Sequence, residues 1–202
     1  MKVVRNDTMK NYREITLLPT ADIALNFLWE KVFQQIHLGF VEMQDSNGIV
    51  PLGIGLPEYF SEYGPLGKKL RIFSISKEII EEFDADTRLK RLSDYVHLTG
   101  IRDTPEKNKF FCRFKRQQPK TNIERFARRR AKKKGIKIED ALLELKQKDF
   151  KDNIVETPYI NMQSLSSDKR FRLFILKEIC DSPAYDGFST YGLSHISTVP
   201  DF

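Results

Sequence analysis

Strand-type and helix-type hydrophobic periodicity alternate along the first half of this chain, and that order restricts the folds it can adopt. Tyr12–Leu18 is typical of a strand and is closed by Pro19, and apolar and polar residues alternate along Lys69–Ser76, as they do in half-buried strands. Helical spacing follows each strand, over Ala21–Leu38 and Lys77–Tyr95. Glycine and proline interrupt the β-rich segment Gly48–Leu56, which predicts an irregular or edge strand.

Two further β segments, Tyr95–Ile101 and Phe110–Lys115, complete the first half, and at least one should join the sheet. The resulting order βαββαβ predicts a ferredoxin-like domain over residues 11–117 of an α+β protein. The sheet of such a domain is a common platform for RNA.

The second half predicts a smaller C-terminal α+β lobe over residues 118–202, which carries an arginine-rich helix. A short helix is expected at Ile138–Lys148. Three strands are expected after it, at Pro158–Ser164, Phe171–Lys177 and Gly187–Leu193. At the other end, residues 1–10 are polar and predict a disordered extension, which leaves Met9 open as the native start.

The excess positive charge of the chain is concentrated in one short segment. Eleven of the twenty-two residues from Arg113 to Lys134 are Lys or Arg, and only Glu124 opposes them. The segment therefore carries +10 while the whole chain carries +6, so the remaining residues sum to −4. A charge held at one place in this way indicates a polyanionic partner.

The pattern also predicts a helix over residues 122–134. Thr121 and Glu124 have the spacing of a capping box, and Gly135 is a natural left-handed stop. Five cations recur at the spacing of a single face: Arg125, Arg128, Arg129, Lys132 and Lys133. An apolar seam on the other side is expected to dock on the body of the protein: Ile123, Phe126, Ala127 and Ala131. The alternative is a solvated surface helix, but such helices mix charges of both signs.

Several function classes lack their sequence signals. No run approaches the length of a membrane span, and no signal peptide, Walker loop or dinucleotide fingerprint is present. Cys112 and Cys180 are lone thiols without metal-ligand spacing, which predicts reduced cysteines and a cytoplasmic location. We therefore expect no metal, no other cofactor and no membrane partner.

A few side chains could do chemistry, although none is decisive alone. His37 lies at the edge of the apolar stripe of the first helix, where a histidine can be a core-edge residue or a general acid or base. The serines that begin at Ser164 could form an ordinary turn, and Tyr191 could be a core aromatic residue.

Five ordered segments together carry a family resemblance. They are VFQQIHLGFV, KKLRIFSIS, RFKRQQPKTNIERFARRRAKKKG, INMQSLSSDKRFRLFI and TYGLS. With them, the chain from about Asn11 to its end resembles the CRISPR repeat-processing endoribonucleases of subtype I-F (Csy) systems.

The resemblance implies a metal-independent endoribonuclease. Such enzymes bind the stem-loop of each repeat in precursor CRISPR RNA and cut at the 3′ base of the stem to generate mature guide RNAs. The 2′-hydroxyl upstream of the scissile phosphate attacks it and leaves a 2′,3′-cyclic phosphate and a 5′-hydroxyl. The implied partners are the RNA hairpin and the other subunits of the subtype I-F surveillance complex, with the protein a monomer by itself.

The resemblance also implies roles for individual residues. His37 matches the catalytic histidine, Ser164 the serine that positions the nucleophile, Ser166 a second serine and Tyr191 the tyrosine that orients the histidine. Phe171 is expected to stack under the last base pair of the stem. Arg116 and Gln118 match the pair that reads purine edges, and the five cations of the predicted helix match residues along the groove of the stem.

The sequence departs from the family pattern in two places. Lys132 and Lys133 stand where arginines are expected, so bidentate contacts are lost there while charge is kept. Asp201 stands where an aromatic residue would fit. No second acid for the leaving group is evident, which leads to the hypothesis that His37 alone transfers protons, with solvent supplying the rest.

Two other functions remain open from the sequence. A non-catalytic RNA hairpin-binding module would use the same basic helix and Phe171, but His37, Ser164 and Tyr191 would not converge. A DNA-binding regulator would place the basic helix in a B-form major groove, but the helix lacks a helix-turn-helix partner. In both cases affinity would fall steeply with salt.

Overall fold

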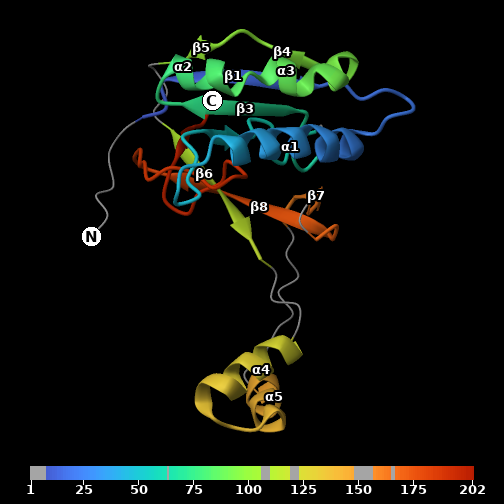
Figure 1. Cartoon of the computed structure of the whole chain (residues 1–202), viewed down its shortest axis with the longest axis vertical. Coiled ribbons are helices and arrows are strands. Elements are labelled where there is room, and N and C mark those ends of the chain that lie inside the picture. The colour runs from blue at the N-terminus through green and yellow to red at the C-terminus, as the bar shows by residue number, and fades with distance from the viewer. Residues whose placement is uncertain (1–7, 63, 106–109, 119–122, 148–156, 165–166) are drawn as a thin grey trace. The chain divides into compact units, whose positions relative to one another are not determined.

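The computed structural model describes residues 8–62, 64–105, 110–118, 123–147, 157–164 and 167–202 (Figure 1). The chain divides into two compact units. The first comprises residues 1–116 and 157–202, and the second comprises residues 117–156. The C-terminal strands therefore belong to the same unit as the N-terminal half. A boundary does lie next to residue 117, but it sets apart only residues 117–156 and not the whole C-terminal lobe that was predicted.

The first unit contains a sheet built from the N-terminal half. Its strands are β1 (Asn11–Leu17), β2 (Gly53–Gly55), β3 (Lys69–Ser74), β4 (Val96–Leu98) and β5 (Arg102–Asp103). They are ordered β2-β3-β1-β4, with β5 paired to β1, and these pairings are antiparallel. The strands predicted at Tyr12–Leu18 and Lys69–Ser76 are thus the two central neighbours of this sheet.

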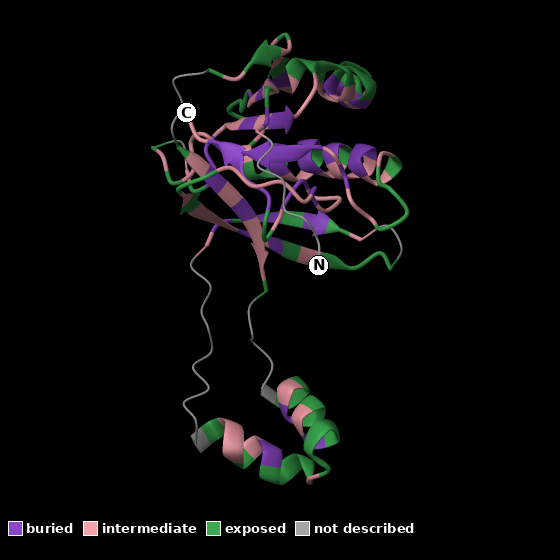
Figure 2. Ribbon diagram, turned by 90° about the vertical axis from the view of Figure 1, so that its left-hand side faces the viewer, coloured by how far each residue is buried: buried purple, intermediate pink, exposed green. Residues whose placement is uncertain are grey.

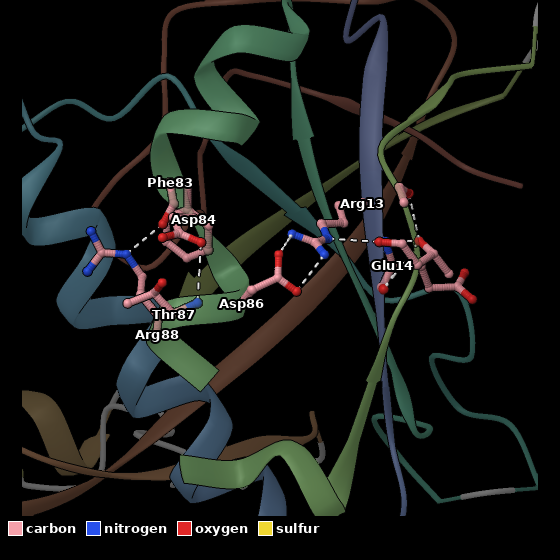
Figure 3. A network of polar contacts seen from close by, with 9 residues as sticks. Arg13, Glu14, Phe83, Asp84, Asp86, Thr87 and Arg88 are labelled. Carbon is pink, nitrogen blue, oxygen red and sulfur yellow. Dashed lines mark hydrogen bonds and ion pairs between the residues drawn. The ribbon is translucent and has the colours of Figure 1, made fainter. Parts of the chain in front are cut away.

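Alternation along the central strands gives the sheet two different faces. Ile15 and Leu17 of β1 lie on the same face as Leu70 and Ile72 of β3, and all four are fully buried. Figure 2 shows buried residues in purple in the sheets and helices of this unit. Arg13 shares this face and makes a bidentate ion pair with Asp86, at 2.7 and 2.9 Å, so the face is the one covered by helices (Figure 3).

The helical layer begins with α1 (Leu25–Glu42), which buries Leu28, Trp29, Val32, Phe33 and Ile36 on one side. The segment with helical spacing over Lys77–Tyr95 is helical but divided into α2 (Lys77–Phe83), α3 (Ala85–Leu89) and the 3-10 helix η1 (Lys90–Tyr95). Asp84 causes the break: its φ of 47° stops α2, and its carboxylate accepts a hydrogen bond of 3.2 Å from the Thr87 amide to cap α3 (Figure 3).

A second sheet lies in the same unit, with strand order β7-β8-β6-β9. Its strands are β6 (Phe111–Gln117), β7 (Tyr159–Gln163), β8 (Arg170–Cys180) and β9 (Val199–Pro200). The sheet shares one apolar core with the first sheet, which is why it does not form the separate lobe that was predicted. Hydrogen bonds join the two parts as well, including Tyr59 Oη to the Ile175 carbonyl at 2.8 Å.

The predicted strand Gly187–Leu193 is also wrong. Apart from a bridge between Phe188 and Val50, this segment is a turn, with φ of 75° at Gly187 and 68° at Gly192. Two backbone conformations in the left-handed region within seven residues prevent an extended strand.

The second unit contains two helices, α4 (Ile123–Lys134) and α5 (Ile138–Gln147). Gly135 has a φ of 67°, which confirms the predicted stop. Ala127 and Ala131 of α4 pack against Ala141 of α5, with Ile136, Leu142 and Leu145 around them. The alanines of the predicted seam therefore pack against α5, whereas the body of the protein was the expected partner.

Three expectations fall partly or wholly outside the described residues: the extension at residues 1–7, the cap at Thr121 and the serine at Ser166. Residues 8–10 of the predicted extension are described, and Met9 is buried at 2% exposure in the core of the first unit.

Candidate active site

Four side chains meet at one place: His37 of α1, Arg116 of β6, Phe171 of β8 and Tyr191 of the turn before β9. The imidazole of His37 is stacked on the Tyr191 ring, with centroids 4.3 Å apart and an interplanar angle of 8°. Phe171 of β8 meets Tyr191 edge-on at 6.5 Å. The guanidinium of Arg116, from β6, lies 5.5 Å from the Phe171 ring and 5.6 Å from the Tyr191 ring. Residues far apart in sequence, each predicted as part of the site, are thus brought together.

A hydrogen bond fixes the tautomer of His37. Its Nδ1 lies 2.8 Å from the carbonyl oxygen of Thr190. Since a carbonyl oxygen only accepts hydrogen bonds, Nδ1 carries the proton and donates it. In the neutral ring Nε2 then keeps its lone pair, which is the atom that a general base uses. The family motifs imply only Tyr191 as the residue that orients His37, and the backbone carbonyl of Thr190 is a contact that they do not reveal.

The turn that presents Thr190 and Tyr191 is closed by its own backbone. Gly192 donates to the Ser189 carbonyl at 2.7 Å, and Ser189 donates to the Leu193 carbonyl at 2.9 Å. Ile54 of β2 donates to the Gly192 carbonyl at 3.0 Å, which anchors the turn to the first sheet. The position of His37 is therefore coupled to the edge strand of that sheet.

Gly192→Ala is expected to disrupt this arrangement. A Cβ at this residue would lie 2.5 Å from the Ile54 side chain and 2.8 Å from the Phe40 ring, at a φ of 68°. The left-handed conformation and the overlap should together cost roughly 2 kcal/mol or more of unfolding free energy. We expect a lower melting temperature and a lower rate of the reaction that uses His37. The variant Gly100→Ala is the control, because a Cβ there meets nothing within 4 Å. Equal stability of the two variants would contradict the coupling.

Ser164 follows β7 and opens the β7–β8 hairpin. Its amide donates to the Lys169 carbonyl at 2.9 Å, and its hydroxyl oxygen accepts a hydrogen bond of 2.9 Å from Ser167 Oγ. The neighbouring Gln163 amide lies 3.4 Å from Gln34 Oε1, one helical turn before His37 on α1. The start of the hairpin loop is therefore held against the helix that carries His37.

A cleft of about 260 Å³ opens beside Phe171 and is lined by β7, β8 and Glu30 of α1. Gln163 and Arg170, a registered pair of the hairpin, form part of its wall. Phe171 is half-buried, so its ring is accessible from this side for stacking.

The second unit presents the predicted cationic face. Arg125, Arg128, Arg129, Lys132 and Lys133 are all exposed. The two other cations, Arg130 and Lys134, turn to α5, where each lies 2.9 Å from Glu144. The hydrogen bond from Lys134 lowers the pKa of Glu144, so this pairing is retained at neutral pH. Gln118, also exposed, belongs to this unit.

Other reactive groups are poor candidates. Burial raises the pKa of the Cys112 thiol to about 12, so this cysteine is not a nucleophile at neutral pH. His97 and His195 are exposed residues of β4 and of the segment before β9. Among the described residues, no three His, Cys, Asp or Glu side chains are grouped as metal ligands would be. Within the same residues, no helix is both long and apolar enough to cross a membrane.

Comparison with known proteins agrees with the resemblance carried by the sequence motifs. The model of the family described as CRISPR-associated protein (Cas_Csy4) matches residues 12–202. The CRISPR-associated endonuclease Cas6/Csy4 of Escherichia coli (strain UTI89 / UPEC) is 30% identical over 195 residues, covering 96% of this chain and all of the relative. The protein of the same name from Pseudomonas aeruginosa (strain UCBPP-PA14) is 27% identical over 198 residues, with the same coverage. A match over nearly the whole length, to the family model and to complete relatives, shows that the chain belongs to the Csy4 family of CRISPR-associated proteins.

Proposed function

We propose that this protein is an endoribonuclease that binds the stem-loop of CRISPR repeats in precursor RNA and cuts at the 3′ base of the stem. The observation that carries the proposal is the hydrogen bond between His37 Nδ1 and the Thr190 carbonyl, which leaves Nε2 as a base. The relatives are named as CRISPR-associated endonucleases, which supports the same reaction class.

In this mechanism His37 Nε2 takes the proton from the 2′-hydroxyl of the nucleotide upstream of the cut. The 2′-oxygen then bonds to the phosphorus, and the bond from phosphorus to the 5′-oxygen breaks. The 5′-oxygen takes a proton from solvent. The products are a 2′,3′-cyclic phosphate and a 5′-hydroxyl, and no metal ion takes part.

The neighbouring residues position the RNA in this proposal. Tyr191 holds the imidazole plane by stacking at 4.3 Å. Ser164 holds the 2′-hydroxyl, with Ser166 assisting, and Phe171 stacks under the last base pair of the stem. Correct placement of the reacting atoms supplies much of the rate, because a bound near-attack geometry removes the entropy of bringing them together.

Recognition of the stem is assigned to basic and amide side chains. Arg125, Arg128, Arg129, Lys132 and Lys133 contact phosphates, which fixes the position of the duplex. Arg116 suits the acceptor edge of guanine, and the Gln118 amide suits adenine. Because Arg116 lies within 5.6 Å of both the Phe171 and the Tyr191 ring, it would read the stem next to the cut.

The proposal also covers the fold of the first half and the cellular setting of the protein. Antiparallel strands in the order β2-β3-β1-β4 support a ferredoxin-like arrangement of the first half. We propose further that the protein is a cytoplasmic monomer by itself and joins the other subunits of the subtype I-F surveillance complex.

The test is cleavage of a repeat hairpin from the host's own CRISPR array in EDTA, with analysis of the product ends. Cleavage that leaves a cyclic phosphate and a 5′-hydroxyl is the expected result. Tight binding without cleavage, with or without Mg²⁺, would instead establish a hairpin-binding module and overturn the catalytic assignments.

A further inference from the structure

A groove of about 540 Å³ runs between α1 and the segment formed by α3 and η1. Most of its lining residues are polar or charged, and Gln163 at the end of β7 lies on one side. The leucines Leu38 and Leu92 provide an apolar patch within it. The mechanism proposed above uses none of the residues of this groove.

The groove continues from the candidate active site. Glu30 and Gln163 line both this groove and the cleft beside Phe171. Gln34 and Leu38 of α1 line the groove, and His37 lies between them in sequence, about 60° from Gln34 around the helix. The groove is therefore continuous with the cleft beside Phe171 and lies on the helix that carries His37.

The charges of the groove favour a phosphate at one end. Glu42 is paired with Arg88 at 2.8 Å, and Glu30 is paired with Lys31 at 3.3 Å. Arg88 is also fixed by its 2.7 Å hydrogen bond to the Phe83 carbonyl (Figure 3). Arg91 is exposed and adds a positive charge beyond these neutralised pairs.

The amide side chains of the groove suit bases. Gln34 Nε2 is buried and has no hydrogen-bond partner among the described residues, although Oε1 of the same side chain contacts the Gln163 amide. That nitrogen is enclosed by protein, so a ligand in the groove does not reach it in this conformation. The exposed Gln35 amide lines the same groove and is open to a ligand. Base edges carry acceptors for such an amide, and the Leu38 and Leu92 side chains suit a base face.

We propose that this groove binds the single-stranded RNA that continues 3′ of the cut, with Arg91 on a phosphate and Gln35 on a base. The proposal rests on the proposed cleavage function and extends it. After cleavage this strand is the leaving product, so the groove contributes to binding of the precursor and not of the retained hairpin. The groove therefore adds to the affinity of the protein for the uncut RNA, and this contribution is lost when the strand is cut.

The experiment compares two synthetic repeat hairpins, each with a 2′-deoxy sugar just upstream of the cut. One ends directly after the scissile phosphate, and the other continues for eight further nucleotides. Affinities for the full-length protein are measured over a range of salt concentrations with wild type, Arg91→Ala and Arg102→Ala. Arg102 is the matched control, because it is an exposed arginine of the same unit outside the groove.

We expect wild type and Arg102→Ala to bind the extended RNA about fivefold more tightly than the short one, and Arg91→Ala to lose that gain. For the extended RNA alone, the slope of log affinity against log salt should fall by about 0.7 in Arg91→Ala, since one phosphate contact to a single strand is removed. Equal affinity of wild type for the two RNAs, or an equal gain in Arg91→Ala, would overturn the groove assignment while leaving the hairpin function intact. Failure of wild type to bind either hairpin would overturn the proposed function and the groove assignment together.

Discussion

Replacing His37 by alanine is expected to slow hairpin cleavage by about 10²- to 10⁴-fold while hairpin affinity stays within a few-fold of wild type. The large loss follows because Nε2 of this imidazole is the proposed proton acceptor, held in place by the Thr190 carbonyl at 2.8 Å. Affinity should survive, because the phosphate contacts are assigned to the other compact unit of the chain. Single-turnover cleavage with saturating protein separates the chemical step from binding.

His97→Ala is the matched control for this variant. His97 is exposed on β4, and the proposal gives it no role, so its variant should cleave at the wild-type rate. Circular dichroism and melting temperature would show that both variants are folded. A folded His37→Ala protein that cleaves at a rate similar to that of wild type would rule out His37 as the base.

The second large effect is expected from the basic face. The double variant Arg128→Ala/Arg129→Ala should weaken hairpin binding by roughly 10-fold to 100-fold near physiological salt. Both residues are exposed on α4, and the 3.6 Å pair of Arg128 with Glu124 lies at the surface, where it contributes little to helix stability. The slope of log affinity against log salt should fall by about 1.5, because two phosphate contacts are lost.

A second double variant serves as the control for charge alone. Lys137→Ala/Lys146→Ala removes two exposed cations from the same unit, but neither lies on the predicted face of α4. It should change affinity by less than about threefold, through long-range electrostatics only. Equal losses in the two double variants would mean that net charge, and not the face of α4, determines binding. At saturating protein, cleavage by the Arg128/Arg129 variant should approach the wild-type rate.

The sequence predicts best where one local signal decides the structure. Strands β1 and β3 form where β-type segments were expected, and Gly135 ends α4 at the expected residue. The segment Lys77–Tyr95 is helical as expected, but Asp84 divides it, because this residue adopts a left-handed conformation that the periodicity does not reveal. The assignment of Gly187–Leu193 as a strand fails for a related reason, since its glycines allow a turn.

Long-range packing is the other source of error. Nothing in the local pattern of β6 or β8 shows that they share a core with the N-terminal sheet, because that depends on contacts between residues far apart in sequence. The same applies to α4, whose alanines pack on α5. The prediction that His37, Tyr191, Phe171 and Arg116 belong to one site came from the family motifs, and the structure places them together. Thr190 was missed, because a main-chain carbonyl leaves no signature in residue type.

In the proposed mechanism the 2′-hydroxyl of the RNA is the nucleophile and His37 is its base. The decisive experiment compares a repeat hairpin with the same hairpin carrying a single 2′-deoxy sugar upstream of the cut, both in EDTA. We expect the first to be cleaved to a cyclic phosphate and the second to be bound with equal affinity but to stay intact. Cleavage of the 2′-deoxy hairpin at the same position would contradict this mechanism, since the attacking oxygen would then have to come from water.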